Sequence, residues 1–215
     1  KLTSDEDQYV EGILELLPDG YGFLRGDNYL STNKDVYVSP VQIKRFRLDT
    51  GDKIKGIKRT PKEGEKFPAL IYVGEVNGQH PENAMKRRSF DDLIPIYPKD
   101  RIRLETTQNE YTMRIMDLLC PIGKGQRGMI VAPPKAGKTT ILKKIANSIT
   151  DNNPEVELIV LLIDERPEEV TDIKEAIEGP NVEVIYSTFD ELPEHHKRVS
   201  EMVIERGRRL VEHNE

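Results

Sequence analysis

Residues 132–139 read Ala-Pro-Pro-Lys-Ala-Gly-Lys-Thr, and this stretch decides the fold expected for the second half of the chain. An apolar segment at residues 128–131 precedes it, and a pattern typical of an amphipathic helix follows over residues 138–149. A strand, a turn with Gly-Lys-Thr and a helix form the context of a phosphate-binding loop. Backbone N–H groups at such a helix N-terminus point toward an anion, and the helix dipole favours its negative charge. We therefore predict nucleotide binding here, although Ala132 stands where the strict pattern has glycine.

Two side chains of this loop have the chemistry that a nucleotide needs. Lys138 can reach the β- and γ-phosphates, and the hydroxyl of Thr139 can ligate Mg²⁺. An ordinary strand–helix turn is the plainer interpretation, because a bare Gly-Lys-Thr often occurs by chance.

The composition permits a folded core and restricts the class of protein. The chain has 215 residues, which fits one large domain or two small ones. Of these residues 33% are charged and 36% are hydrophobic, and no apolar run reaches the length of a membrane span. The single cysteine, Cys120, excludes an internal disulfide, is expected in the core and fits a reducing cytoplasm. The N-terminus lacks a signal-peptide pattern, and the missing initiator methionine suggests a fragment.

The basic residues are unevenly distributed along an acidic chain. The net charge is −6, which alone argues against nucleic-acid binding. Residues 44–66, however, hold nine lysines and arginines against four acidic residues, a local balance of +5. Such a basic strip suits a phosphate backbone, and it equally suits a solvated charged face. Charge alone leaves both interpretations open.

The first half has the short, alternating pattern of a small barrel. Residues 1–8 form a polar tail, and residues 9–76 hold five candidate strands separated by turn residues. Ser39 is a fair N-cap, and Pro40 suits the first position of a helical turn. Five strands with this turn after the third predict a barrel of the OB or cold-shock type. The expected strands are residues 10–16, 20–25, 36–38, 53–59 and 69–76.

The second half has a different pattern. Residues 77–100 lose the alternation and are expected to form a linker. From residue 101 to residue 215, apolar strands alternate with helices, which implies a parallel α/β sheet. The expected strands are residues 128–131, 158–163 and 182–187, and the expected helices are residues 138–149, 168–178 and 193–212.

An aromatic pair in the first half suits single-stranded nucleic acid. Tyr21 and Phe23 lie two positions apart, so a strand places both rings on one face, and Arg25 joins that side. Exposed rings beside cations form a platform on which bases stack with little sequence preference. Asp35 and Tyr37, on the next strand, can add hydrogen bonds to base edges. In the alternative, both rings fill the core of the barrel.

A charged cluster follows the strand predicted at residues 158–163. Asp164 and Glu165 lie there, and ligands of open α/β sheets bind beyond the carboxyl ends of the strands. Phosphoryl transfer to water needs a carboxylate that positions or deprotonates the water, and Glu165 is the candidate. Arg166 can contact a phosphate or a neighbouring subunit. His195 has no partner ligands in the sequence, so no metal site is expected there.

These segments together resemble one family, the bacterial transcription termination factor Rho. The resemblance runs from about residue 9 to the end of the chain, and Ala132 is typical of the family. It implies a cold-shock-like RNA-binding domain followed by the first part of a RecA-like ATPase domain. The segments that carry it are residues 19–25, 35–40, 61–65, 121–128, 132–139, 161–171, 187–191 and 201–205.

The resemblance implies a role for each half. The first would bind single-stranded, pyrimidine-rich RNA, and the second would bind ATP with Mg²⁺, which Thr139 would ligate. Glu165 and Lys138 would be the catalytic residues. The implied RNA-binding residues are Gly20, Tyr21, Gly22, Phe23, Leu24, Arg25, Asp35, Val36, Tyr37, Glu65, Lys66 and Phe67. The implied nucleotide-binding residues are Gly123, Lys124, Gly125, Gln126, Arg127, Gly128, Lys135, Ala136, Gly137, Lys138, Thr139, Thr140 and Arg166.

The resemblance also implies a larger assembly. The whole protein would be a homohexameric, RNA-dependent ATPase and 5′-to-3′ RNA translocase or helicase that terminates transcription in the bacterial cytoplasm. Its partners would be RNA and the transcription elongation complex, RNA polymerase with its elongation factors, and not a membrane. Because the chain stops after the helix predicted to end at residue 212, it would lack the Mg²⁺-orienting aspartate and the arginine finger. We expect this chain alone to bind RNA, to bind nucleotide weakly and to hydrolyse negligible ATP.

Two other kinds of protein share parts of this pattern. One is a single-stranded RNA-binding module whose phosphate loop does not hydrolyse nucleotide, and Glu165 argues against it. The other is a RecA-like DNA motor or a rotary-ATPase subunit with an accessory barrel. The platform at Tyr21 and Phe23 argues against the rotary ATPase, which has no need for base stacking. The choice of RNA over DNA depends on 2′-hydroxyl contacts, which the sequence does not reveal.

Overall fold

The computed structural model describes residues 8–213, so the predicted polar tail, apart from Gln8, lies outside the described residues. The chain divides into two compact units. The first runs up to Leu93 and resumes at Ile185, and the second is Ile94–Val184. No helix among the described residues combines the length and the hydropathy that a membrane span requires.

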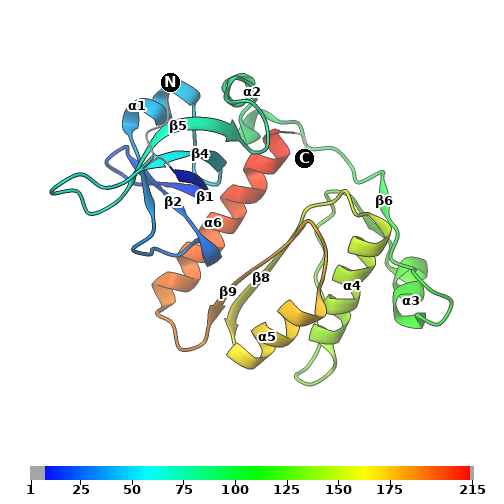
Figure 1. The fold of residues 1–215 in the computed structure, drawn as a ribbon. Coiled ribbons are helices and arrows are strands. Elements are labelled where there is room, and N and C mark those ends of the chain that lie inside the picture. The colour runs from blue at the N-terminus through cyan, green and yellow to red at the C-terminus, as the bar shows by residue number, and fades with distance from the viewer. Residues whose placement is uncertain (1–7, 214–215) are drawn as a thin grey trace. The chain divides into compact units, whose positions relative to one another are not determined.

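The first unit contains a closed five-stranded β-barrel (Figure 1). The strands pair in the order β1-β2-β3-β5-β4, and every pair is antiparallel except β3 with β5. The predicted barrel is confirmed, and the expected limits of the third, fourth and fifth strands agree with the structure. The strands are β1 (Gln8–Leu16), β2 (Gly22–Arg25), β3 (Val36–Val38), β4 (Lys53–Arg59) and β5 (Ala69–Val76).

Alternation along these strands sends one set of apolar side chains into the barrel. The core they form includes Leu14, Leu24, Val38 and Ile54. Helix α1 (Pro40–Phe46) follows β3 and begins with a capping box in which the side chains of Ser39 and Gln42 bond to each other's backbone N–H. This is the helical turn that Ser39 and Pro40 predicted.

Helix α6 (Pro193–Glu212) joins the barrel unit through a buried polar network. Arg206 donates to the side-chain oxygen of Asn77 at 2.5 Å, and the amide nitrogen of Asn77 donates to Asp52 at 2.8 Å. Arg87 forms ion pairs with Asp52 at 2.5 Å and with Glu212 at 3.2 Å. Buried ions of this kind are stable when each has a partner.

The segment expected to be a linker is therefore partly structured. Helix α2 (Pro81–Lys86) and a short 3₁₀ helix, η2 (Phe90–Asp92), lie within it, and Arg87 between them is held by the buried network. A second 3₁₀ turn, η1 (Asp27–Tyr29), lies between β2 and β3. The expected domain limits stay predictions.

The second unit alternates short strands with helices. Strands β6 (Arg101–Ile102) and β7 (Ile122–Gly123) pair antiparallel, and β8 (Leu158–Glu165) pairs with β9 (Val182–Thr188), within which the division between the units falls. The helices are α3 (Tyr111–Leu119), α4 (Lys138–Asn152) and α5 (Pro167–Ala176). The helices expected near residues 138, 168 and 193 thus form, whereas α3 was not predicted.

Two predictions for this half are wrong. No strand forms at residues 128–131, where Met129 and Val131 are 86% and 83% exposed. A β-strand is formed by hydrogen bonds to a neighbouring strand, and among the described residues no strand pairs with this segment. The described strands of this half lie in two two-stranded sheets, β6 with β7 and β8 with β9. Cys120, expected in the core, is exposed at the C-cap of α3.

Candidate functional site

Four aromatic rings gather on the outside of the barrel: Tyr21 before β2, Phe23 on β2, Tyr37 on β3 and Phe67 before β5. The register of the strands sets Phe23 directly opposite Tyr37. The ring centres are 5.0 Å apart for Phe23 and Phe67, 5.6 Å for Tyr21 and Tyr37, and 5.9 Å for Tyr21 and Phe23. All four rings are half-buried and none belongs to the core cluster, so the alternative that they fill the core is wrong.

Two cations lie over these rings. The guanidinium of Arg25 is 5.0 Å from the centre of Phe23, and the ammonium of Lys66 is 5.3 Å from the centre of Phe67. Arg25 is nevertheless buried, bonds to Glu15 at 2.6 Å and forms a close ion pair with Asp35. It is therefore not the free cation that the sequence suggested, and its structural effect is to hold β1, β2 and the start of β3 together beneath the rings.

Asp35 is also engaged within the barrel. Its carboxylate accepts hydrogen bonds from the backbone N–H of Thr32 at 3.0 Å and from the hydroxyl of Thr32 at 2.9 Å, besides the ion pair with Arg25. The side chain is 2% exposed. Of the pair predicted to bond to base edges, only Tyr37 thus presents a polar atom beside the open groove described next.

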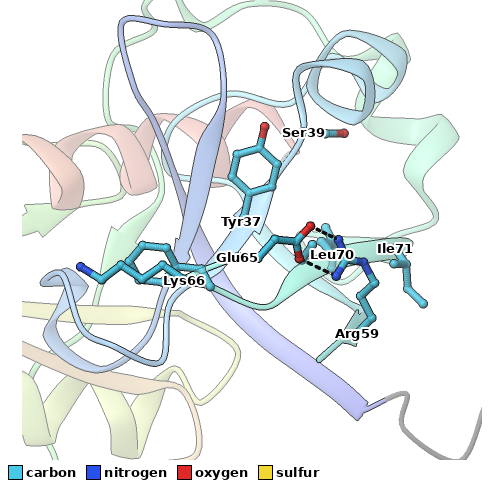
Figure 2. Close-up of a pocket in the computed structure, with 9 residues that line it drawn as sticks. Tyr37, Ser39, Arg59, Glu65, Lys66, Leu70 and Ile71 are labelled. Carbon is cyan, nitrogen blue, oxygen red and sulfur yellow. Dashed lines mark hydrogen bonds and ion pairs between the residues drawn. The ribbon is translucent and has the colours of Figure 1, made fainter. Parts of the chain in front are cut away.

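A groove of about 490 Å³ adjoins the rings, and Figure 2 shows the side chains that line it. Glu65 and Arg59 form a two-bonded ion pair there, with nitrogen–oxygen distances of 2.6 and 2.8 Å. The groove is lined by Tyr37, Ser39, Arg59, Glu65, Lys66, Phe67, Ala69, Leu70 and Ile71. The sequence had counted Arg59 as part of the basic strip and had not predicted its pairing with Glu65, six positions later across the turn between β4 and β5.

Glu65 keeps both its charge and a free acceptor site. The hydrogen bonds from Arg59, and then one from the backbone N–H of Lys62, lower the pKa of Glu65 to about 2, so the carboxylate is ionised at neutral pH. Among residues 8–213, its Oε2 accepts from Arg59 and from Lys62, and its Oε1 accepts one bond, from Arg59. Since each carboxylate oxygen can accept about two bonds, Oε1 can still accept one from an amino group in the groove.

Ion pairs reduce the charge available from the basic strip. Lys53 bonds to Glu11 at 2.7 Å, and Lys55 lies 3.4 Å from Glu11 and 3.7 Å from Glu75. The pairing of Arg59 with Glu65 removes a third cation. The strip is therefore partly a solvated, ion-paired face, and the cations beside the groove are few.

The helix that follows the predicted phosphate loop begins where the sequence places it. Helix α4 begins at Lys138, and the N-cap Gly137 has φ +86°, a left-handed conformation that favours glycine. Lys135 also has a positive φ of +61°, which is uncommon for a residue with a side chain. No side chain caps the helix, so the N–H groups of its first turn are open to an anion. Lys138 is exposed and Thr139 is half-buried beside them.

Glu165 is the last residue of β8, and its carboxyl group is half-buried. Burial, and then the neighbouring carboxyl of Glu169, raise the pKa of Glu165, and the nearby Arg166 opposes this only in part. Arg166 is the N-cap of α5. Asp164 has φ +58°, so the backbone is strained just before Glu165. A carboxyl group with a raised pKa suits a proton acceptor.

The glycine-rich segment 123–128 forms a turn at the end of β7, and the N–H of Lys124 donates to the carbonyl oxygen of Asp100 at 2.7 Å. The side-chain oxygen of Gln126 accepts from the N–H of Gly123 at 2.9 Å, and Gly125 has φ +84°. Within residues 8–213, no hydrogen bond or ion pair joins this turn, the start of α4 and the end of β8. The start of α4 and the end of β8 lie where the sequence predicted them, and the assembly of these segments into one nucleotide site stays a prediction.

The histidines have ordinary partners. A ring nitrogen of His196 lies 2.8 Å from the hydroxyl of the buried Ser187, and His195 lies 3.4 Å from Glu191. The described residues contain no group of three His, Cys, Asp or Glu side chains placed to hold a metal ion.

Comparison with known protein families separates the barrel from the half that carries the phosphate loop. A family model described as the Rho termination factor, RNA-binding domain matches residues 10–82. A second, described as the ATP synthase alpha/beta family, nucleotide-binding domain, matches residues 112–204. The first covers the barrel with its ring cluster, and the second covers the phosphate loop and Glu165.

Whole-chain relatives give the same result. Transcription termination factor Rho of Bacillus subtilis is 55% identical over 95% of this chain and 48% of its own length. The Rho proteins of Haemophilus influenzae and Pseudomonas aeruginosa are 55% and 54% identical over 98% of this chain, and 50% and 51% of their own lengths. The chain thus spans about half the length of the curated relatives it matches. It belongs to the transcription termination factor Rho family, as its motifs predicted.

Proposed function

We propose that the chain binds single-stranded RNA on its barrel and ATP with Mg²⁺ at its phosphate loop, as part of an RNA-dependent ATPase that terminates transcription. The observation that carries the proposal is the cluster of four half-buried rings beside an open groove that contains an ionised carboxylate. Stacked bases need exposed π-faces, and Tyr21, Phe23, Tyr37 and Phe67 provide them.

The groove adds selectivity to the stacking. A base that enters it meets the free acceptor of Glu65, which suits the exocyclic amino group of cytosine. Lys66, beside Phe67, can bond to the phosphate on the same nucleotide. Val36 and Leu24 act only indirectly, because their buried side chains support the two strands from inside the barrel.

The residues of the second unit fit a nucleoside triphosphate. The uncapped start of α4 and the left-handed Gly137 leave backbone N–H groups free, Lys138 would bond to phosphate oxygens, and Thr139 would hold Mg²⁺. Bound Mg²⁺ supplies neutralisation of the phosphate charge. Glu165 would accept the proton of the attacking water, a role that its raised pKa favours.

The activity of the whole protein is part of the proposal. The related proteins are named transcription termination factors, which supports a role in termination. A homohexamer, 5′-to-3′ translocation and contact with RNA polymerase are proposed from the family resemblance. The domain limits proposed are residues 9–76, 77–100 and 101–215. We expect hydrolysis by this chain alone to be negligible, because residues 128–131 are not held in a sheet beside the loop.

The test is a fluorescence-anisotropy titration with labelled oligo-C RNA. The Tyr21→Ala/Phe23→Ala variant should bind at least tenfold more weakly than the unmodified chain, and duplex RNA should bind weakly to both. Repeating the titration at two salt concentrations separates stacking from phosphate contacts, which salt weakens. Equal binding by the variant and the unmodified chain, with strong salt dependence in both, would show that only non-specific electrostatics operates.

A further inference from the structure

A β-bulge on β5 turns two successive side chains to the outside of the barrel. Ile57 of β4 faces Tyr72, and the next residue, Lys58, faces Leu70, so Ile71 is the extra residue of the bulge. Strict alternation would send either Ile71 or Tyr72 inward, but both are exposed, by 42% and 48%.

The bulge connects the groove to a second surface. Ile71 lines the groove, as Figure 2 shows, and Tyr72 is its direct neighbour in the chain. The strand register places Tyr72 opposite Ile57 of β4, and Ile57 opposite Tyr9 of β1. These three residues form one row across the outside of the barrel. Tyr9 is 89% exposed, so an aromatic ring stands on each side of Ile57 on the outer face.

Gly56 shows that this crossing of β4 and β5 is tightly built. A Cβ atom at Gly56 would lie 2.1 Å from the carbonyl oxygen of Tyr72, so only glycine fits there. The close approach fixes the backbone of Tyr72 and hence the side of the sheet on which its ring lies.

The charges around the row favour an anionic chain on one side only. A small pocket of about 150 Å³ next to it is lined by Lys58 and Arg59, and Arg59 also lines the groove. On the other side, the next outer row pairs Lys55 with Glu11 and Glu75. Arg59 is paired with Glu65, so Lys58 supplies the positive charge beside the path from the groove, and carboxylates limit the path on the other side.

We propose that the outer face of β5, β4 and β1 is a second stacking surface for single-stranded RNA, which continues from the groove over Tyr72 toward Tyr9. Lys58 lies beside the phosphates of this continuation. The inference rests on RNA binding at the groove, as proposed above. Separated aromatic rings beside cations suit bases of any sequence, so this surface adds affinity without adding selectivity.

The test is the dependence of affinity on RNA length. Oligo-C of two, four, six and eight nucleotides is titrated by anisotropy against the unmodified chain, Tyr72→Ala, Tyr72→Phe and the matched control Tyr97→Ala, whose ring is also exposed. We expect Tyr72→Ala to bind the shortest RNA normally and to lose about fivefold or more of the affinity gained with the longer ones. Tyr72→Phe and Tyr97→Ala should behave as the unmodified chain.

The outcomes separate this inference from the proposed function. If Tyr72→Ala binds RNA of every length as tightly as the unmodified chain, the second stacking surface is refuted. The exposed row would then serve another protein or only stabilise the sheet. Normal binding of the shortest RNA in that case leaves the groove intact as a site. If no length binds, or if Tyr21→Ala/Phe23→Ala binds normally, the proposed function itself fails.

Discussion

Replacing Glu65 with glutamine should change which base the groove prefers. Glu65 lines the groove, and its Oε1 atom accepts one bond from Arg59 among the described residues, so this oxygen can accept a second bond from a base. Glutamine retains the shape but carries no charge, and it presents an amide N–H₂ at one of the two positions. We expect Glu65→Gln to weaken binding of oligo-C by about 5- to 150-fold, the range for losing one good polar contact to a base.

The comparison with oligo-U makes this prediction specific. Uracil presents a carbonyl oxygen where cytosine presents its amino group, so the change should weaken oligo-U binding far less. Competition anisotropy with both RNAs measures the ratio directly. The reasoning is refuted if the two RNAs lose affinity equally, or if neither loses any.

A pH series tests whether Arg59 keeps the Glu65 carboxylate ionised. The pKa of Glu65 is lowered to about 2 mainly by Arg59, so its charge, and with it the contact to cytosine, should persist down to pH 5. In Arg59→Leu the pKa should rise toward its ordinary value, and oligo-C affinity should begin to fall as the pH approaches 5. An Arg59→Leu variant with the same pH profile as the unmodified chain would show that Arg59 does not control this charge.

Three further predictions follow from other parts of the chain. Lys138→Ala should weaken binding of a fluorescent ATP analogue by about tenfold or more, because a charged contact to phosphate is lost, and should leave oligo-C binding unchanged. Lys143→Ala on the same helix is the control, and equal effects of the two changes would argue against nucleotide binding at the phosphate loop. Asp52→Ala should lower the free energy of unfolding, measured by urea denaturation, by about 3–5 kcal/mol, since it leaves the buried Arg87 with one partner fewer. Glu11→Ala, which removes an exposed ion pair, should lower it by less than about 1 kcal/mol. Similar losses in the two variants would contradict the importance of the buried network. Glu169→Gln should lower the pKa of Glu165, because the neighbouring carboxyl that helps to raise it is removed. Since a raised pKa makes stability fall as the pH rises from the ordinary pKa of the carboxyl group to its pKa in the fold, this fall should be smaller in the variant. An NMR titration of Glu165 that shows no change would exclude the coupling.

The barrel could be predicted closely because its signals are local. Alternating residues, turn residues and the Ser39–Gln42 capping box are all read within a few positions, and the strands that they predicted formed with almost the expected limits. The same alternation placed Tyr21 and Phe23 on one face of the strand, and the structure decided that this face lies outside the core.

The rest depended on contacts between distant residues. The pairing of Arg25 with Asp35, the role of Arg87 and the bulge at Ile71 arise from neighbours across strands or helices, which a linear pattern does not contain. The failure at residues 128–131 has the same origin, because an apolar run predicts burial but not the neighbouring strand that it needs. The nucleotide-site residues were identified by motif, and their mutual arrangement stays a prediction.

The most direct measurement is an NMR titration of the ¹⁵N-labelled chain with four-nucleotide oligo-C, following backbone amide shifts. The account predicts that the largest changes fall on residues 20–25, 35–37 and 65–67, with smaller ones at residues 71–72 and none at residues 138–140. Changes confined to residues 44–47, or spread evenly over the lysines and arginines of the barrel unit, would contradict a stacking site at the four rings.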